Sequence, residues 1–185
     1  MATSEREVGR DWGSVSSTTR IPRFARPWER TGYQRIWLRV ATSEWRTLAV
    51  VPAEDGMPTH DVANLIMTLG VFHGESIGVL DFRYVRVNRA LDAIRTAESQ
   101  LEPGERLIFA TRSIRENLAT IPLARATDGV ILCVSLGSTS MRLATETIEQ
   151  IGKERFLGSI VVRVESDDAS ARKVTPSQRR LEERC

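Results

Sequence analysis

The sequence predicts an α/β fold in which a doubly wound, mostly parallel sheet of five or more strands carries helices on both faces. Three observations lead to this fold class. Short apolar runs recur along the chain, segments with helical periodicity separate them, and the runs are continuous instead of alternating with polar residues. Continuous apolar runs are typical of strands buried on both faces, and strand–helix alternation is typical of parallel sheets.

Apolar runs predict five strands. Their residue ranges are 47–51, 77–80, 106–110, 129–135 and 157–164. The run at 129–135 is the clearest, because it is unbroken from Val130 to Val134. Cys133 lies inside this run, so we expect a buried thiol there, whereas Cys185 is expected to face solvent. Two cysteines in this arrangement make no disulfide framework.

Helical periodicity predicts the segments between these strands. Four apolar residues at i, i+3, i+4 and i+7 predict a helix over residues 61–71: Val62, Leu65, Ile66 and Leu69. Thr59 is its expected N-cap, because Pro58 disfavours helix at the residue before it. A second helix, over 87–100, is marked by Val87, Leu91, Ile94 and Ala97. Further helices are predicted over 114–125, where Pro122 breaks the pattern, and over 139–151.

The segment before the first strand alternates bulky and basic residues. A helix over 33–39 would bring Tyr33, Trp37 and Val40 to one side. Two interpretations remain open for this side. The helix either packs on its own domain or provides a contact surface for another subunit.

Length and composition indicate one domain with two polar ends. We expect an N-terminal arm over residues 1–30, an α/β domain over 31–165 and a polar tail over 166–185. The net charge is only +2, which argues against a nucleic-acid-binding face, although the arginines between Arg20 and Arg39 leave an anionic partner for the arm open. No run approaches the ~20 apolar residues of a spanning helix, and no signal peptide is recognisable, so we expect a cytoplasmic protein without direct membrane insertion.

Several segments carry a resemblance through their order along the chain. They are Arg35 and Arg39, the strand at 48–51, Ala63-Asn64-Leu65, the run 123–134 with its Asp128-Gly129 pair, Gly137-Ser138-Thr139, and the last strand from residue 157. Together they resemble the cytoplasmic domain of the bacterial tyrosine autokinases of polysaccharide export, within the MinD/ParA-like group of P-loop ATPases. The resemblance covers residues 33 to 164 and implies a P-loop NTPase-like fold.

The loop after the first strand departs from that family, whose members bind triphosphate with a Gly-x-Gly-Lys-Ser/Thr loop. The corresponding positions here are Asp55, Gly56, Met57, Pro58 and Thr59. Asp55 and Met57 stand at the family's glycines, Pro58 at its lysine and Thr59 at its magnesium-binding hydroxyl. Proline has neither an N–H nor a charge, and methionine does not readily adopt glycine-only dihedrals. The phosphate-binding features of the loop are therefore lost.

Other positions depart from the family in the same direction. Glu54 and Asp61 add carboxylates beside the expected phosphate position. After the second strand, Asp81 remains where the family has its first acid, but Arg83 stands at the second. After the third strand, Ala110 replaces the acid that organises metal and water in the family. Asp81 and Arg83 are expected to form an ion pair at a strand end instead of an acid/base pair.

Other chemistries are weakly indicated. His60 and His73 are the only histidines and have no cysteine near them in the sequence, so surface or capping roles are favoured over a zinc site. Ser135 and Ser138 follow a strand without the Gly-x-Ser-x-Gly pattern of a hydrolase nucleophile. We therefore expect no catalytic residues, no metal and no cofactor.

The resemblance and the losses together imply a non-catalytic, pseudokinase-like pseudo-ATPase that binds or regulates other proteins in exopolysaccharide or capsule biosynthesis and export. Its expected partner is a polysaccharide-export membrane protein, which would recruit it to the inner membrane, or an active paralogous ATPase, with a homo-oligomer as a further option. The expected contact residues are Tyr33, Arg35, Trp37, Arg39, Arg83 and Arg86. Two alternatives remain: an active ATP- and Mg-dependent tyrosine kinase or ATPase with an atypical loop, and a structural scaffold that assembles through its arms.

Overall fold

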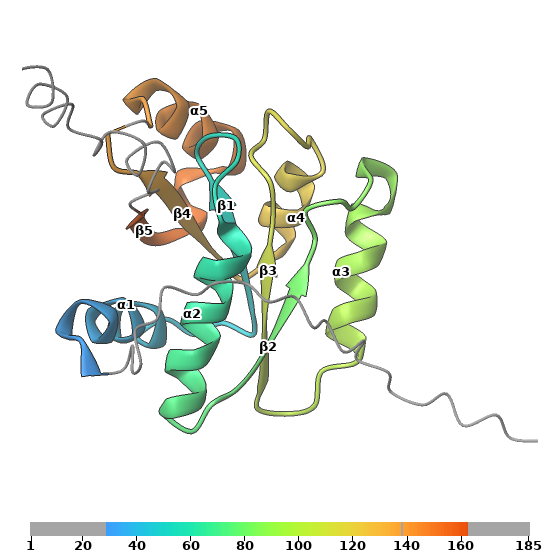
Figure 1. Ribbon diagram of the computed structural model, residues 1–185. Helices are drawn as coiled ribbons and strands as arrows, with labels where there is room; N and C mark the ends of the chain where they lie inside the picture. The colour runs from blue at the N-terminus through green and yellow to red at the C-terminus, as the bar shows by residue number, and fades with distance from the viewer. Residues whose placement is uncertain (1–28, 138, 163–185) are drawn as a thin grey trace, which may run out of the picture.

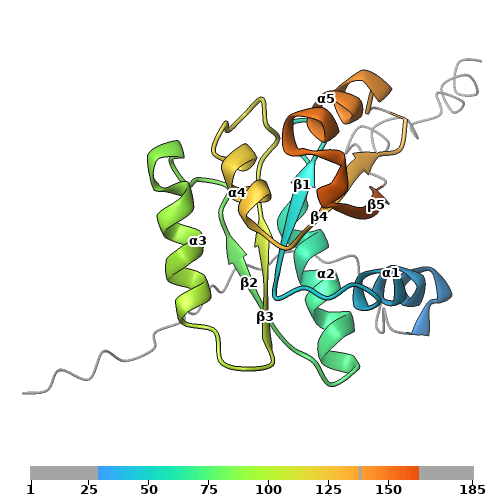
Figure 2. The same cartoon turned by 180° about the vertical axis from the view of Figure 1, so that it is seen from behind.

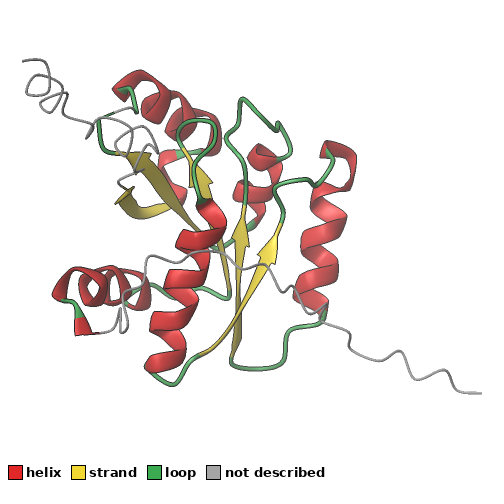
Figure 3. Cartoon of the chain, viewed as in Figure 1, coloured by secondary structure: helices red, strands yellow, loops and turns green. Residues whose placement is uncertain are grey.

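The computed structural model describes residues 29–137 and 139–162, which contain a five-stranded parallel sheet (Figure 1, Figure 3). The strands are β1 (Thr47–Pro52), β2 (Ser76–Asp81), β3 (Glu105–Ala110), β4 (Gly129–Ser135) and β5 (Phe156–Val162). They lie in the order β2-β3-β1-β4-β5, and every neighbouring pair is parallel. The predicted fold class is confirmed.

Helices cover both faces of the sheet, as the two opposite views show (Figure 1, Figure 2). One face carries α1 (Thr31–Ala41) and α2 (Thr59–Phe72). The other carries α3 (Ala90–Ser99), α4 (Thr120–Ala126) and α5 (Met141–Ile151). This division follows from right-handed crossovers: the connection from β1 to β2 runs one way along the sheet, and the three later connections run the other way.

Strand β1 shows why the apolar runs are continuous. Leu48 and Val50 pack in the core under α1 and α2, whereas Ala49 and Val51 pack in the core on the opposite face. All four side chains are buried. Because successive side chains of a strand point to opposite faces, a strand covered on both faces needs apolar residues at every position.

The predicted strands agree closely with the observed ones, but the helix expected over 87–100 differs. The chain first forms a 3-10 turn at Val87–Arg89 and then α3. Val87 and Leu91 are exposed, and the buried positions are Ala90, Ile94 and Ala97. The prediction that Val87 and Leu91 mark one face with Ile94 and Ala97 is wrong. Val87 lies in the 3-10 turn outside α3, and within α3 the small Ala90 occupies the buried face while Leu91 lies outside it.

Pro122 does not break a helix. The segment at 114–119 forms turns, and α4 begins at Thr120, so Pro122 lies in the first helical turn. The N–H groups of a first turn have no acceptor within the helix, and proline is therefore tolerated there. The helix predicted over 139–151 begins at Met141, with Ser140 as its N-cap, whose hydroxyl accepts a hydrogen bond from Leu143 N.

The predicted ends of the chain lie almost entirely outside the described residues. Of the arm over 1–30, the structure describes Glu29 and Arg30, and of the tail over 166–185 it describes nothing. Cys185 and Ser138 are also outside, as are the last two residues of the strand predicted over 157–164. Among the helices that are described, none is long and apolar enough to cross a membrane.

Candidate functional site

The loop at residues 53–58 joins β1 to α2 at the carboxyl edge of the sheet, where open parallel sheets bind their ligands. Three positions in or beside it offer no free backbone donor. Ala53 N donates to Cys133 O at 2.9 Å, Thr59 N donates to Met57 O at 2.9 Å, and Pro58 has no N–H. Met57 turns its side chain into the core under α2. A phosphate cradle needs amides that point into open space, and these three positions offer none.

Thr59, at the position of the expected magnesium-binding hydroxyl, has its side chain turned inward. Its Oγ1 donates to Thr111 O at 2.6 Å, and the residue is only 1% exposed. Thr111 is itself fixed to β1, because both its N and its Oγ1 donate to Val50 O. The prediction that Thr59 is the N-cap of α2 is wrong: Pro58 occupies the N-cap position, and Thr59 is the first helical residue.

Asp55 ties the loop to the segment after β3. The hydroxyl of the buried Ser113 donates to the Asp55 carboxylate, and the same Ser113 oxygen accepts a hydrogen bond from Glu116 N at 3.1 Å. The two loops are adjacent because β1 pairs with β3 in the sheet. Asp55 therefore acts as an internal acceptor.

Asp81 and Arg83 form the expected ion pair at the end of β2. Arg83 Nε lies 2.8 Å from Asp81 Oδ1, and its Nη2 lies 2.6 Å from Oδ2. The hydrogen bonds from Arg83 lower the pKa of Asp81 against the effect of burial, and the same contact raises the pKa of Arg83. Asp61 differs, since burial raises its pKa more than the nearby His60 and Arg83 charges lower it.

The third substituted position, Ala110, is fully buried at the end of β3. It pairs with Val50 on one side and with Asp81 on the other, so it lies between the two loops already described. The next residue, Thr111, binds Thr59 and Val50 through hydrogen bonds. The structure thus brings together the predicted positions at 55–59, 81 and 110, and hydrogen bonds join the loop after β1 to the segment after β3.

Helix α1 lies apart from this edge. Trp37 and Val40 are buried against the domain, and Tyr33 packs beside them, so the helix packs on its own domain. The Trp37 ring stacks on His73, at the opposite end of α2 from the loop, with ring centroids 5.7 Å apart. Arg35 and Arg39 are exposed. The expected contact residues therefore fall into two separate groups. One lies on α1, and the other, Arg83 and Arg86, lies in the loop after β2.

Neither histidine shows metal-binding geometry. His60 Nδ1 lies 3.0 Å from Asn64 Nδ2, and His73 Nε2 lies 3.1 Å from Gln34 Oε1. Over the ranges 29–137 and 139–162, no three His, Cys, Asp or Glu side chains form a group that could hold a metal ion.

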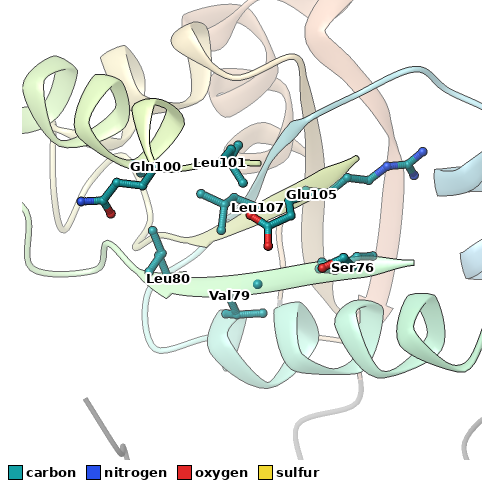
Figure 4. Close-up of a pocket in the computed structure, with 11 residues that line it drawn as sticks. Ser76, Val79, Leu80, Gln100, Leu101, Glu105 and Leu107 are labelled. Atoms are coloured by element: carbon teal, nitrogen blue, oxygen red, sulfur yellow. The ribbon is translucent and has the colours of Figure 1, made fainter. Parts of the chain in front are cut away.

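Two hollows lie away from the loop. The first, of about 240 Å³, opens beside the edge strand β2 and the end of α3. In Figure 4, Leu80, Leu101 and Leu107 lie on the α3 side of the two strands, whereas Val79 points to the opposite face. The second lies at the amino edge of the sheet, where Trp45 and Arg106 are among its lining residues. The first hollow is lined by polar residues, among them Gln100 and Arg106, as well as by leucines.

No protein-family model matches the chain, and no curated protein is similar enough to match it. The functional argument therefore depends on the geometry of the carboxyl edge.

Sequence reasoning identified the loop positions but missed three residues that complete this edge: Ser113, Asn117 and Tyr84. Ser113 binds Asp55, Asn117 joins the loops after β2 and β3, and Tyr84 lies between two arginines. One signal was present for Tyr84, since it is an aromatic residue next to Arg83 in a loop. Ser113 and Asn117 carried no signal, because their partners are distant in the sequence.

Cys133 is expected to be unreactive in the folded protein. It lies in the centre of β4, fully buried, and burial raises the pKa of its thiol to about 12. At about pH 8 almost no thiolate would exist, and a reagent could not reach it. In a Cys185→Ser variant, DTNB should release no thiol signal from the native protein and one equivalent after denaturation. Rapid labelling without denaturant would contradict this burial.

Proposed function

We propose that this protein is a non-catalytic pseudo-ATPase with a P-loop NTPase-like fold, and that it works as a protein-binding or regulatory module. It is pseudokinase-like because the residues expected to bind the nucleotide are replaced. The observation that carries the proposal is the Thr59 hydroxyl, which is buried and donates to Thr111 O. A metal-binding hydroxyl must face the nucleotide, and this one faces the strand end. Binding Mg-ATP in the usual manner would require this hydrogen bond to break.

Electrostatics support the same proposal. The lysine that would neutralise phosphate oxygens is replaced by Pro58, and Glu54, Asp55 and Asp61 lie in or beside the loop. A like-charge pair about 4 Å apart costs on the order of 4 kcal/mol at an effective dielectric constant of about 20. Arg83, whose charge acts on Asp61 beside the loop, is already held by Asp81. Triphosphate binding at this edge would combine repulsion with the loss of internal hydrogen bonds.

The cellular setting of the proposal comes from the resemblance in the sequence. We place the protein in the cytoplasm, in exopolysaccharide or capsule biosynthesis and export, where it would bind a polysaccharide-export membrane protein or an active paralogous ATPase. A retained scaffold without a functional nucleotide site suits a partner-binding role, because the surface loops remain while the catalytic constraint on them is gone.

The test is a titration with a fluorescent ATP analogue in the presence of Mg²⁺, checked by isothermal titration calorimetry. We expect no saturable binding below about 1 mM, which corresponds to a binding free energy weaker than about −4 kcal/mol. ATP with Mg²⁺ should also leave the melting temperature unchanged.

The contrary outcome is equally specific. Saturable micromolar binding that an Asp81→Ala variant abolishes, and that the exposed control Asp92→Ala on α3 retains, would identify an active nucleotide site with an atypical loop. That result would overturn the proposal, because Asp81 is the surviving acid at this edge, whereas Asp92 lies on an exposed helix surface.

A further inference from the structure

Two loops at the carboxyl edge are connected by hydrogen bonds. They are residues 82–89, after β2, and residues 112–118, after β3. Asn117 joins them, because its side-chain amide donates to Arg83 O at 3.3 Å and to Val85 O at 2.9 Å. Its Oδ1 accepts from Ala119 N at 3.0 Å. The relative position of the two loops is therefore set by hydrogen bonds to the main chain.

An apolar cluster supports these loops from below. It is formed by buried residues of α3 and of the start of α4, with two residues of the first loop packed against them: Ala90, Ile94, Ala119, Leu123, Phe82 and Val85. This cluster holds the backbone that carries the surface side chains in place. A partner that binds them would lose little free energy in ordering the loops.

Tyr84 is the most prominent side chain of the surface. It is 71% exposed, and the guanidinium carbons of Arg112 and Arg83 lie 4.6 and 5.7 Å from its ring centroid. Val87 and Leu118 are also exposed. Arg83 is oriented by Asp81, and Arg112 by Glu116 at 3.2 Å. Tyrosine and arginine in this combination are the residues that most often contribute the binding energy of protein interfaces.

The charge of the two loops is strongly one-sided. They contain five arginines and one acid: Arg83, Arg86, Arg89, Arg112, Arg115 and Glu116. Arg86, Arg89 and Arg115 are exposed and, within the described part of the chain, form no ion pair. We define the arginine–tyrosine surface as Arg83, Tyr84, Arg86, Val87, Arg112 and Leu118, with Arg89 and Arg115 at its margin.

We propose that the arginine–tyrosine surface binds an acidic segment of a partner protein in which an apolar or aromatic residue lies between the carboxylates. The proposal rests on the proposed function as a binding module and specifies its partner. Carboxylates complement the free arginines, and the apolar residue would pack on Tyr84, Val87 and Leu118. A uniformly charged phosphate chain fits less well, because it would bring charge against these apolar side chains and against Asp81 and Glu116 nearby.

The test uses the full chain and a short fluorescein-labelled peptide in which glutamates flank single leucine and phenylalanine residues. Fluorescence polarisation is measured at ionic strengths of about 0.05 and 0.15 M, because screening distinguishes charge from apolar contact. We expect saturable binding, weakened by salt. The same peptide with glutamine at every glutamate should bind at least about tenfold more weakly.

Variants locate the site. Arg86→Glu combined with Arg115→Glu should weaken peptide binding by about tenfold or more, and Tyr84→Ala should weaken it by a similar factor. The matched control is Arg142→Glu, an exposed arginine on α5, which should stay within about twofold of the unmodified protein. Thermal melts of all variants should coincide, since the altered side chains are exposed.

Three outcomes would overturn the inference: unchanged binding in the Arg86→Glu, Arg115→Glu variant, equal loss in the Arg142→Glu control, or tighter binding of inorganic polyphosphate than of the peptide at the same site. These outcomes are distinct from the nucleotide test. If the protein binds ATP with micromolar affinity and the surface variants still weaken peptide binding, the pseudo-ATPase proposal alone is refuted. If the protein does not bind ATP and the surface variants leave peptide binding unchanged, only the proposed role of the arginine–tyrosine surface is refuted.

Discussion

Trp37→Ala is expected to lower the free energy of unfolding by about 3–5 kcal/mol, the range for removal of a large buried aromatic side chain. Trp37 is 4% exposed and is the main contact of α1 with the domain. Its ring stacks on His73 and lies against Gly70, where a Cβ would have its ring carbons 2.9 Å away. The substitution would leave a cavity between α1 and α2 that the backbone cannot readily fill.

Urea denaturation measures this loss, with Leu38→Ala as the matched control. Leu38 is the next residue of the same helix but is 61% exposed, so its truncation should change stability by less than about 0.5 kcal/mol. Equal and small losses for both variants would mean that α1 does not pack on its own domain. The helix would then be available as the subunit contact that the sequence left open.

Asp128→Ala is expected to lower the free energy of unfolding by about 2–3 kcal/mol, because hydrogen bonds to a charged acceptor are lost and a buried donor is left without one. One carboxylate oxygen, Oδ2, accepts from Arg46 N at 2.8 Å, from Thr47 N at 2.9 Å and from Thr47 Oγ1 at 3.0 Å. These bonds join the start of β1 to the residue before β4, and Thr47 is buried.

The Asp128→Asn variant distinguishes the contribution of the charge to stability from that of the hydrogen bonds. Asparagine keeps one oxygen acceptor, so we expect a loss of roughly half that of the alanine variant in chemical denaturation. An alanine variant as stable as the unmodified protein would show that the Asp128–Thr47 contacts contribute nothing to the pairing of β1 with β4. Asp128, the acid of the Asp128-Gly129 pair in the resemblance, would then have no structural role here.

The contacts of Asp128 and Gly129 give a physical reason for the Asp-Gly pair in the resemblance. Asp128 lies at the amino edge of the sheet, opposite the loop at 53–58, and it acts through main-chain donors of β1. Gly129 follows because there is no room for a side chain: a Cβ would lie 2.9 Å from Leu157 Cγ and 3.3 Å from Leu48 Cδ1. An Asp-Gly pair at this place therefore serves the fold.

The carboxyl edge has a common physical pattern. Thr59 donates to Thr111, Ser113 donates to Asp55, and Asp81 binds Arg83. The side chains of Thr59, Asp55 and Asp81 are thus each paired within the protein. Unpaired buried polar groups cost free energy, so these internal contacts stabilise the carboxyl edge.

The strands could be predicted from the sequence because each signal is local. The observed bounds of β4, Gly129–Ser135, equal the predicted range, and the other strands differ by one or two residues at their described ends. Strand residues buried on both faces form continuous apolar runs that need no knowledge of the neighbouring strand. The predicted helix face at 87–100 was wrong because Val87 lies in a 3-10 turn before the helix, and because Ala90, a weak apolar signal, takes the buried position in place of Leu91.

The sequence by itself determined the class of the fold, the loop in which a phosphate site would have to lie, and the absence there of a lysine and of the expected glycines. Only the tertiary structure decided which groups fill that place: Thr59 meets Thr111, Asp55 meets Ser113, and Asn117 joins the loops that carry Tyr84. Strand character follows from residue type and period, whereas these contacts follow from the order β2-β3-β1-β4-β5, which brings together strand ends that are far apart in the chain.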